Sequence, residues 1–236
     1  MLYAFGDSFT YGFSLPEEER INCTWPIVLA SKLGIKANNL SLPGASNWRT
    51  ARKIQSLNID REDIVIISWS SVDRFEFGVN ADYNPSATSI GDIVETDDGV
   101  KTKRFFRSLT GRTSDEHARQ FNSLAYSKFY NLQWFIEMHK VAVDSCIYKL
   151  NSIGCRWLMF NAWTTNPKID TPNYIFPNST MYDNIVQRRE GELMRYWTKE
   201  EHAHIAKIIY DKLYNDQTNQ DQYEIYNANT NLDWYY

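Results

Sequence analysis

Short apolar runs alternate along the chain with longer stretches of helical periodicity. Four of these runs predict β-strands, at residues 2–5, 37–42, 63–69 and 156–160. The third run contains Ile64-Val65-Ile66-Ile67, in which no polar residue alternates with the apolar ones. A continuous apolar run of this kind is typical of a strand that is covered on both faces of its sheet.

Four further stretches predict helices, at residues 25–33, 48–57, 123–153 and 198–213. Their starts carry helix signals, because Thr24 is a candidate N-cap of the first helix and Ser46 or Asn47 caps the second. A capping box, Thr198-Lys199-Glu200-Glu201, opens the last helix. Strands and helices alternate in order, which predicts a three-layer α/β/α sandwich with a mainly parallel central sheet.

Two long polar segments interrupt this alternation, at about 78–120 and 164–197. They show little periodicity, and we interpret both as insertions rather than as domain boundaries. A chain of 236 residues fits one large domain or two small ones. We therefore expect a single domain over residues 1–236, with a loop-rich insertion at about 78–120 and a C-terminal tail at about 215–236.

Composition narrows the classes of partner. The formal net charge is −4, so the chain has no general basic field to attract nucleic acid or anionic membranes. No apolar run approaches the roughly 18 residues of a membrane span, and no signal peptide is visible. The three cysteines show no disulfide or zinc spacing. We expect no metal, no cofactor, no nucleic-acid partner and no membrane partner, with the chain cytoplasmic as synthesised.

Candidate chemistry lies at the ends of the first three predicted strands. Gly6-Asp7-Ser8 follows the first strand, Pro43-Gly44 follows the second, and Ser70-Ser71 follows the third. In open α/β sheets, sites gather at the carboxyl ends of the strands. A serine on a sharp turn presents its hydroxyl to a cleft there, and the Gly44 N–H is a candidate donor to a developing oxyanion. The structural alternative for Ser8 is a turn serine that caps the next segment.

These segments resemble a known family. Gly-Asp-Ser with Gly12 four residues after the serine resembles the first block of the SGNH hydrolases, also called the GDSL type. The Gly44 segment resembles the second block, Ser70-Ser71 lies where the third block belongs, and residues 198–206 resemble the helix after the family's histidine. Phage-encoded members are similar in beginning at the first strand and in having a Trp-Ser/Thr-Ser segment followed by arginine.

The resemblance implies an SGNH/flavodoxin-like fold and a serine esterase mechanism. Ser8 Oγ would attack an ester carbonyl, while the N–H groups of Ser8 and Gly44 and the hydroxyl of Ser70 hold the oxyanion. The implied substrate is a small-molecule ester, such as an O-acetylated carbohydrate. Six further residues are candidates for supporting the site or contacting substrate: Asp7, Asn47, Trp69, Ser71, Arg74 and Tyr196.

The general base departs from the family pattern. Aligned on the last helix, Tyr196 occupies the histidine position and Leu193 the aspartate position. Neutral tyrosine has a pKa near ~10 and is a poor base near neutral pH. His202 lies on the inward face of the last helix and is the candidate base, with core packing as its alternative role. We expect His139 at the surface of the long helix.

Two hypotheses of different classes stay open. The first is an SGNH-type ester hydrolase that uses Ser8 and a displaced base such as His202. The second is a catalytically impaired member with a structural or glycan-binding role, for example in a phage virion, because the family's histidine, aspartate and asparagine are all missing. A homo-oligomer or virion proteins would then be its partners. A flavodoxin-like phosphate binder is disfavoured, since no Gly-x-Gly-x-x-Gly or Walker pattern is present.

Overall fold

The computed structural model describes residues 1–78, 94–95, 101–105, 120, 123–162, 166–176, 180–181 and 197–215. Four strands form the main sheet: β1 (Leu2–Phe5), β2 (Ala37–Asn39), β3 (Ile64–Trp69) and β7 (Arg156–Asn161). They pair in parallel in the order β2-β1-β3-β7. The predicted α/β class with a parallel central sheet is therefore confirmed.

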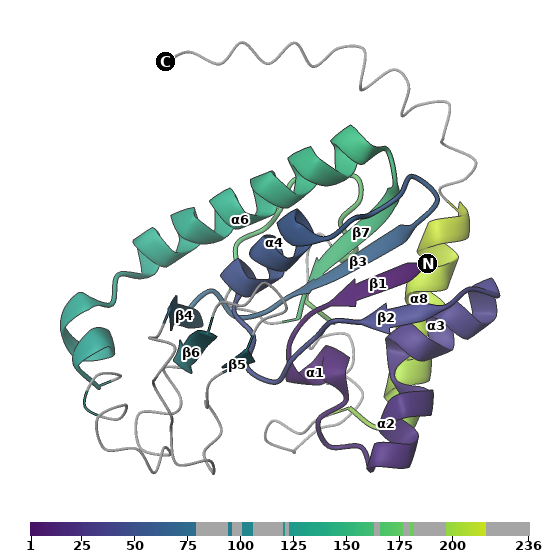
Figure 1. The fold of residues 1–236 in the computed structure, drawn as a ribbon, viewed down its shortest axis with the longest axis horizontal. Helices are drawn as coiled ribbons and strands as arrows, with labels where there is room; N and C mark the ends of the chain where they lie inside the picture. Colours follow the sequence, from purple (N-terminus) through teal and green to yellow (C-terminus); the bar gives the residue numbers. More distant parts are fainter. Residues whose placement is uncertain are drawn as a thin grey trace.

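Helices cover both faces of this sheet (Figure 1). α3 (Trp25–Leu33) and α8 (Lys199–Asn215) lie on one face, and α4 (Asn47–Ser56) and α6 (Leu132–Ile153) lie on the other. Ile64 and Ile66 of β3 join the core with α3 and α8, while Val65 and Ile67 join the core with α4 and α6. Because successive strand residues point to opposite faces, a strand between two helical layers is apolar throughout.

The helix ends largely follow the predicted signals. Ser46 Oγ accepts a hydrogen bond of 3.1 Å from Arg49 N at the start of α4. The capping box of α8 is formed, since Thr198 N donates to Glu201 Oε2 at 2.7 Å and Glu201 N donates to Thr198 Oγ1 at 3.4 Å. Thr24 stands at the N-cap of α3, but its side chain makes no capping bond.

Two local features differ from the prediction. Two short helices, α1 (Ser8–Tyr11) and α2 (Glu17–Cys23), lie between β1 and α3. The long helix expected over 123–153 is broken, because a π-helical segment, Ala125–Phe129, precedes the extended residue Tyr130. α6 then starts afresh at Leu132, where Asn131 Oδ1 accepts a hydrogen bond of 3.1 Å from Trp134 N.

The segment expected to be loop-rich contains a second, antiparallel sheet. Its strands are β4 (Phe75–Gly78), β5 (Val94–Glu95) and β6 (Lys101–Phe105), in the order β4-β6-β5. Short strands therefore lie within the segment for which a loop-rich insertion is expected, and the predicted bounds of the single domain stay a prediction. Apart from these strands and Gln120, residues 79–120 lie outside the described residues, as does the predicted tail from residue 216 onward. None of the described helices is long and apolar enough to cross a bilayer.

Candidate active site

The turn after β1 is built by tight packing at Gly6. A Cβ added to Gly6 would lie 2.4 Å from Thr10 Oγ1 and 3.1 Å from Ser68 Cβ, so only glycine fits between α1 and β3. Ser8 follows as the first residue of α1, and 6% of its surface is exposed. The fold thus places Ser8 at the carboxyl end of β1, one of the two inner strands of the described sheet, where sites of open α/β sheets lie.

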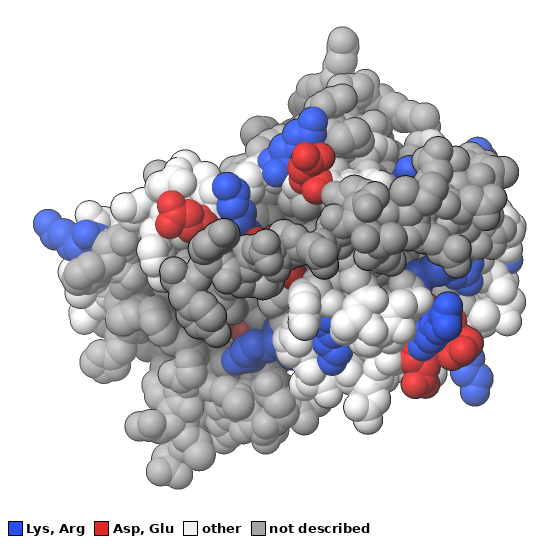
Figure 2. Space-filling view, turned by 90° about the horizontal axis from the view of Figure 1, so that it is seen from above, with Lys and Arg blue, Asp and Glu red and all other residues white. Residues whose placement is uncertain are grey.

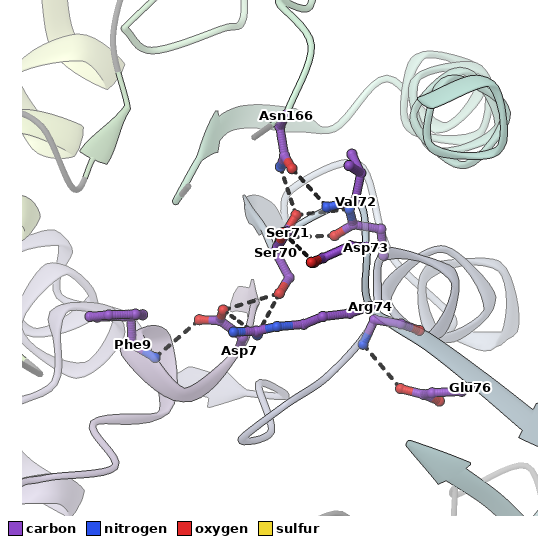
Figure 3. Close-up of polar contacts among 11 residues, drawn as sticks. Asp7, Phe9, Ser70, Ser71, Val72, Asp73, Arg74, Glu76 and Asn166 are labelled. Carbon is purple, nitrogen blue, oxygen red and sulfur yellow. Dashed lines mark hydrogen bonds and ion pairs between the residues drawn. The ribbon is translucent and has the colours of Figure 1, made fainter. Parts of the chain in front are cut away.

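Asp7 is completely buried beside Ser8, and its carboxylate has charged and polar partners (Figure 3). Oδ1 accepts a hydrogen bond of 3.0 Å from Phe9 N, which caps α1. Oδ2 accepts from Ser70 Oγ at 3.1 Å and forms an ion pair of 2.6 Å with Arg74 Nη1. These contacts fix Asp7 as an anchor between β1 and the loop after β3.

Ser70 is held on every polar atom by neighbouring side chains. Its N–H donates to Asn47 Oδ1 at 2.8 Å, and its carbonyl accepts from Asn47 Nδ2 at 2.9 Å and from Asn166 Nδ2 at 2.6 Å. Its hydroxyl donates to Asp7 and accepts from Arg74 Nη1 at 2.6 Å. Because a serine hydroxyl has one proton, the proton of Ser70 is already used by Asp7. In this structure the Ser70 hydroxyl, which was predicted to donate to the oxyanion, therefore donates to Asp7 instead.

The Gly44 segment lies next to the turn that carries Ser8. Leu42 N donates to Gly6 O at 3.2 Å, which extends the β1–β2 pairing past the end of β2. Gly44 follows in a tight turn with φ of 75°, a conformation that favours glycine. The structure thus brings the two predicted N–H donors, Ser8 and Gly44, to the same edge of the sheet.

Two predicted contact residues have other surroundings. Trp69 is fully buried, and its indole donates to Met159 Sδ at 3.4 Å, so its place is in the core behind the site. Ser71 Oγ donates to Asp73 Oδ1 at 2.5 Å in the turn that leads to Arg74. Tyr196 lies outside the described residues.

His202 lies on α8 and packs against the start of α3. Its Nδ1 accepts a hydrogen bond of 3.2 Å from Trp25 N, and its ring meets Trp197 edge-on at 5.6 Å. Only 1% of its surface is exposed, and burial lowers the pKa of His202 to about 4. Its described contacts are with this core and not with Ser8, so its assignment as the base stays a prediction.

Two residues of the site were missed by the sequence reasoning. His139 is buried, contrary to the surface position expected for it, and its Nδ1 lies 3.0 Å from Asn47 Nδ2. Its spacing of four residues from Phe135 and from Val143 is the helical signal that places it on the inward face. Asn166 bridges Ser70 O and Val72 N, at 2.6 and 2.9 Å, from the loop after β7.

Charged side chains of both signs share the described surface (Figure 2). On the face shown in Figure 2, the basic and acidic side chains of the described residues are interspersed. No group of three His, Cys, Asp or Glu residues within the described ranges is arranged to hold a metal ion.

The chain matches no family model, and a search of curated proteins found no match. Solved structures similar to it include a protein described as a lipolytic member of the G-D-S-L family from Desulfitobacterium hafniense (12% identity, TM-score 0.43, covering 89% of this chain and 98% of that one). Another is the psychrotrophic esterase EstA from Pseudoalteromonas sp. (11% identity, TM-score 0.46, covering 92% of this chain and 98% of that one). A third is TesA (11% identity, TM-score 0.43, covering 91% of this chain and 98% of that one).

Proposed function

We propose that this chain is a serine ester hydrolase of the SGNH type, with Ser8 as its nucleophile. The observation that carries the proposal is the place of Ser8, at the carboxyl end of β1 and directly after the anchored carboxylate of Asp7. A serine on a sharp strand-to-helix turn can present its hydroxyl to a substrate, as the nucleophile of a serine hydrolase must.

In this proposal, Ser8 Oγ attacks the carbonyl of an ester, such as an acetyl group on a carbohydrate. The backbone N–H groups of Ser8 and Gly44 stabilise the oxyanion, since both lie at the same sheet edge. The proton of Ser8 passes to a general base, and His202 is the histidine that we assign to this role. His202 must then exchange its bond to Trp25 N for one to Ser8.

A second candidate function is a catalytically impaired SGNH fold with a structural or glycan-binding role, as in a virion. Two contacts favour it. The hydroxyl proton of Ser70 is used by Asp7, and the Nδ1 lone pair of His202 is used by Trp25 N. Both groups that would assist catalysis thus serve the fold in the described arrangement.

Labelling with a fluorophosphonate probe, which reacts with activated serines, separates the two candidates. We expect covalent labelling of the native chain, its loss in Ser8→Ala and its retention in Ser31→Ala, a matched exposed serine on α3. Intact-mass measurement gives the stoichiometry. An unlabelled native chain would refute the hydrolase, and labelling gained in Tyr196→His would identify the impaired member.

A further inference from the structure

The amide group of Asn47 is enclosed by hydrogen-bonding partners from two other elements. Its Oδ1 accepts from Ser70 N at 2.8 Å, and its Nδ2 donates to Ser70 O at 2.9 Å. A third partner, His139 Nδ1 on α6, lies 3.0 Å from the same Nδ2. Since Nδ2 carries two hydrogens, one serves Ser70 and the other serves His139. All three residues are buried.

This geometry defines the state of the His139 ring. An amide nitrogen only donates, so Nδ1 of His139 accepts with its lone pair, and the ring carries its proton on Nε2. Only 3% of the surface of His139 is exposed, and burial lowers its pKa to about 4, which keeps the ring neutral near pH 7. Trp69 meets the ring edge-on at 5.3 Å and limits its rotation.

We infer that His139 is a positioning residue, whose Nδ1 holds the Asn47 amide in the orientation that clamps the Ser70 peptide. Ser70 N and O select the amide orientation, but they leave one buried N–H of Asn47 without an acceptor. His139 supplies that acceptor. Without it the amide would gain by rotating toward another acceptor, because a buried donor without a partner is costly.

The clamp on the Ser70 peptide bears on the candidate site because Ser70 in turn binds Asp7, the residue before Ser8. The Ser70 hydroxyl donates to Asp7, and Arg74 Nη1 contacts both groups at 2.6 Å. A displaced Ser70 peptide would therefore loosen the anchor of Asp7. The consequence of this loosening for Ser8 chemistry rests on the proposed function, whereas the clamp itself does not.

Hydrogen exchange of the Ser70 backbone N–H, followed by NMR, tests the inference without any activity. His139→Leu removes the acceptor, His139→Asn offers a carbonyl oxygen near the place of Nδ1, and Cys146→Ala is a matched control that perturbs the same face of α6 away from Asn47. We expect His139→Leu to speed Ser70 exchange by about tenfold or more relative to Ile66, in the middle of β3. His139→Asn should restore most of the protection, and Cys146→Ala should change both positions alike.

Two outcomes would overturn the inference: equal effects of His139→Leu and Cys146→Ala on Ser70, or no rescue by His139→Asn. If His139→Leu does not fold, the imidazole ¹⁵N shifts of the native chain decide, because a proton on Nδ1 contradicts an acceptor at that atom. Fluorophosphonate labelling of the same variants adds the link to Ser8. A native chain that takes no label would refute the proposed function and leave the exchange result to judge the clamp.

Discussion

Mild acid should destabilise this fold through two buried histidines, His139 and His202. Burial lowers the pKa of each to about 4, whereas a histidine in the unfolded chain has a pKa of about 6.5. Between these values the unfolded state binds more protons than the folded state. The stabilisation is therefore complete above the unfolded pKa, falls as the pH drops through this window, and stops falling below the folded pKa.

The size of the effect follows from the two pKa values. At about pH 5, each histidine lowers the free energy of unfolding by about 2 kcal/mol relative to neutral pH, or about 4 kcal/mol for the pair. That is a large part of a typical stability of about 5–15 kcal/mol. The contribution of Asp63 belongs to a more acidic window. Burial opposes its ionisation, but hydrogen bonds from the N-terminal ammonium and from Asp60 N keep the pKa of Asp63 lowered.

Urea unfolding at about pH 7 and about pH 5 measures the effect. His139→Asn and His202→Asn keep an acceptor near Nδ1 but cannot titrate, so each should remove about 2 kcal/mol of the pH-dependent loss, whatever its stability at neutral pH. Cys146→Ala is the control, because it lowers stability without removing a histidine. If both histidine variants lose as much stability on acidification as the native chain, the assignment of neutral, buried rings is wrong.

Two further predictions concern the site and the thiols. Arg74→Met removes the guanidinium beside the buried Asp7 carboxylate, so it should lower the free energy of unfolding by about 3–5 kcal/mol, as measured by urea titration. A loss below ~1 kcal/mol would contradict the role of this ion pair as an anchor. Burial raises the pKa of Cys146 to about 12 and of Cys155 to about 11. A thiol reagent should therefore modify only Cys23 in the folded chain, which peptide mass mapping would show. Modification of either buried thiol in the native state would refute this prediction.

The main sheet could be predicted because its signals are local. Ile64 to Ile67 are apolar at every position, and this pattern requires cover on both faces, whichever helices provide it. The capping box at Thr198 is equally local, since its partner is three residues away. Both signals are readable from a few consecutive residues, although the helices that cover the strand come from distant parts of the chain.

The contacts of the site could not be predicted in the same way. Asn166 lies 96 residues from Ser70 in sequence, and nothing in its own loop indicates that its amide reaches the end of β3. The pairing of Asp7 with Arg74 spans 67 residues and depends on the order of strands in the sheet. His139 is the exception. Its spacing of four residues from Phe135 and from Val143 indicates a buried position, whereas its charged neighbours Glu137 and Lys140 favour the surface.

The hydrogen bonds of His202 set the cost of using it as a base. Since Nδ1 accepts from Trp25 N, the ring carries its proton on Nε2, and neither nitrogen is free to take a proton from Ser8. Freeing one requires the ring to turn or to change tautomer, and either change leaves the buried Trp25 N–H without its acceptor. That costs about 1–3 kcal/mol, which slows a reaction by about 5- to 150-fold. Such a factor is small beside the rate enhancements of enzymes. The described arrangement is therefore compatible with slow turnover at Ser8 as well as with an inactive site. The rate of fluorophosphonate labelling separates these two cases.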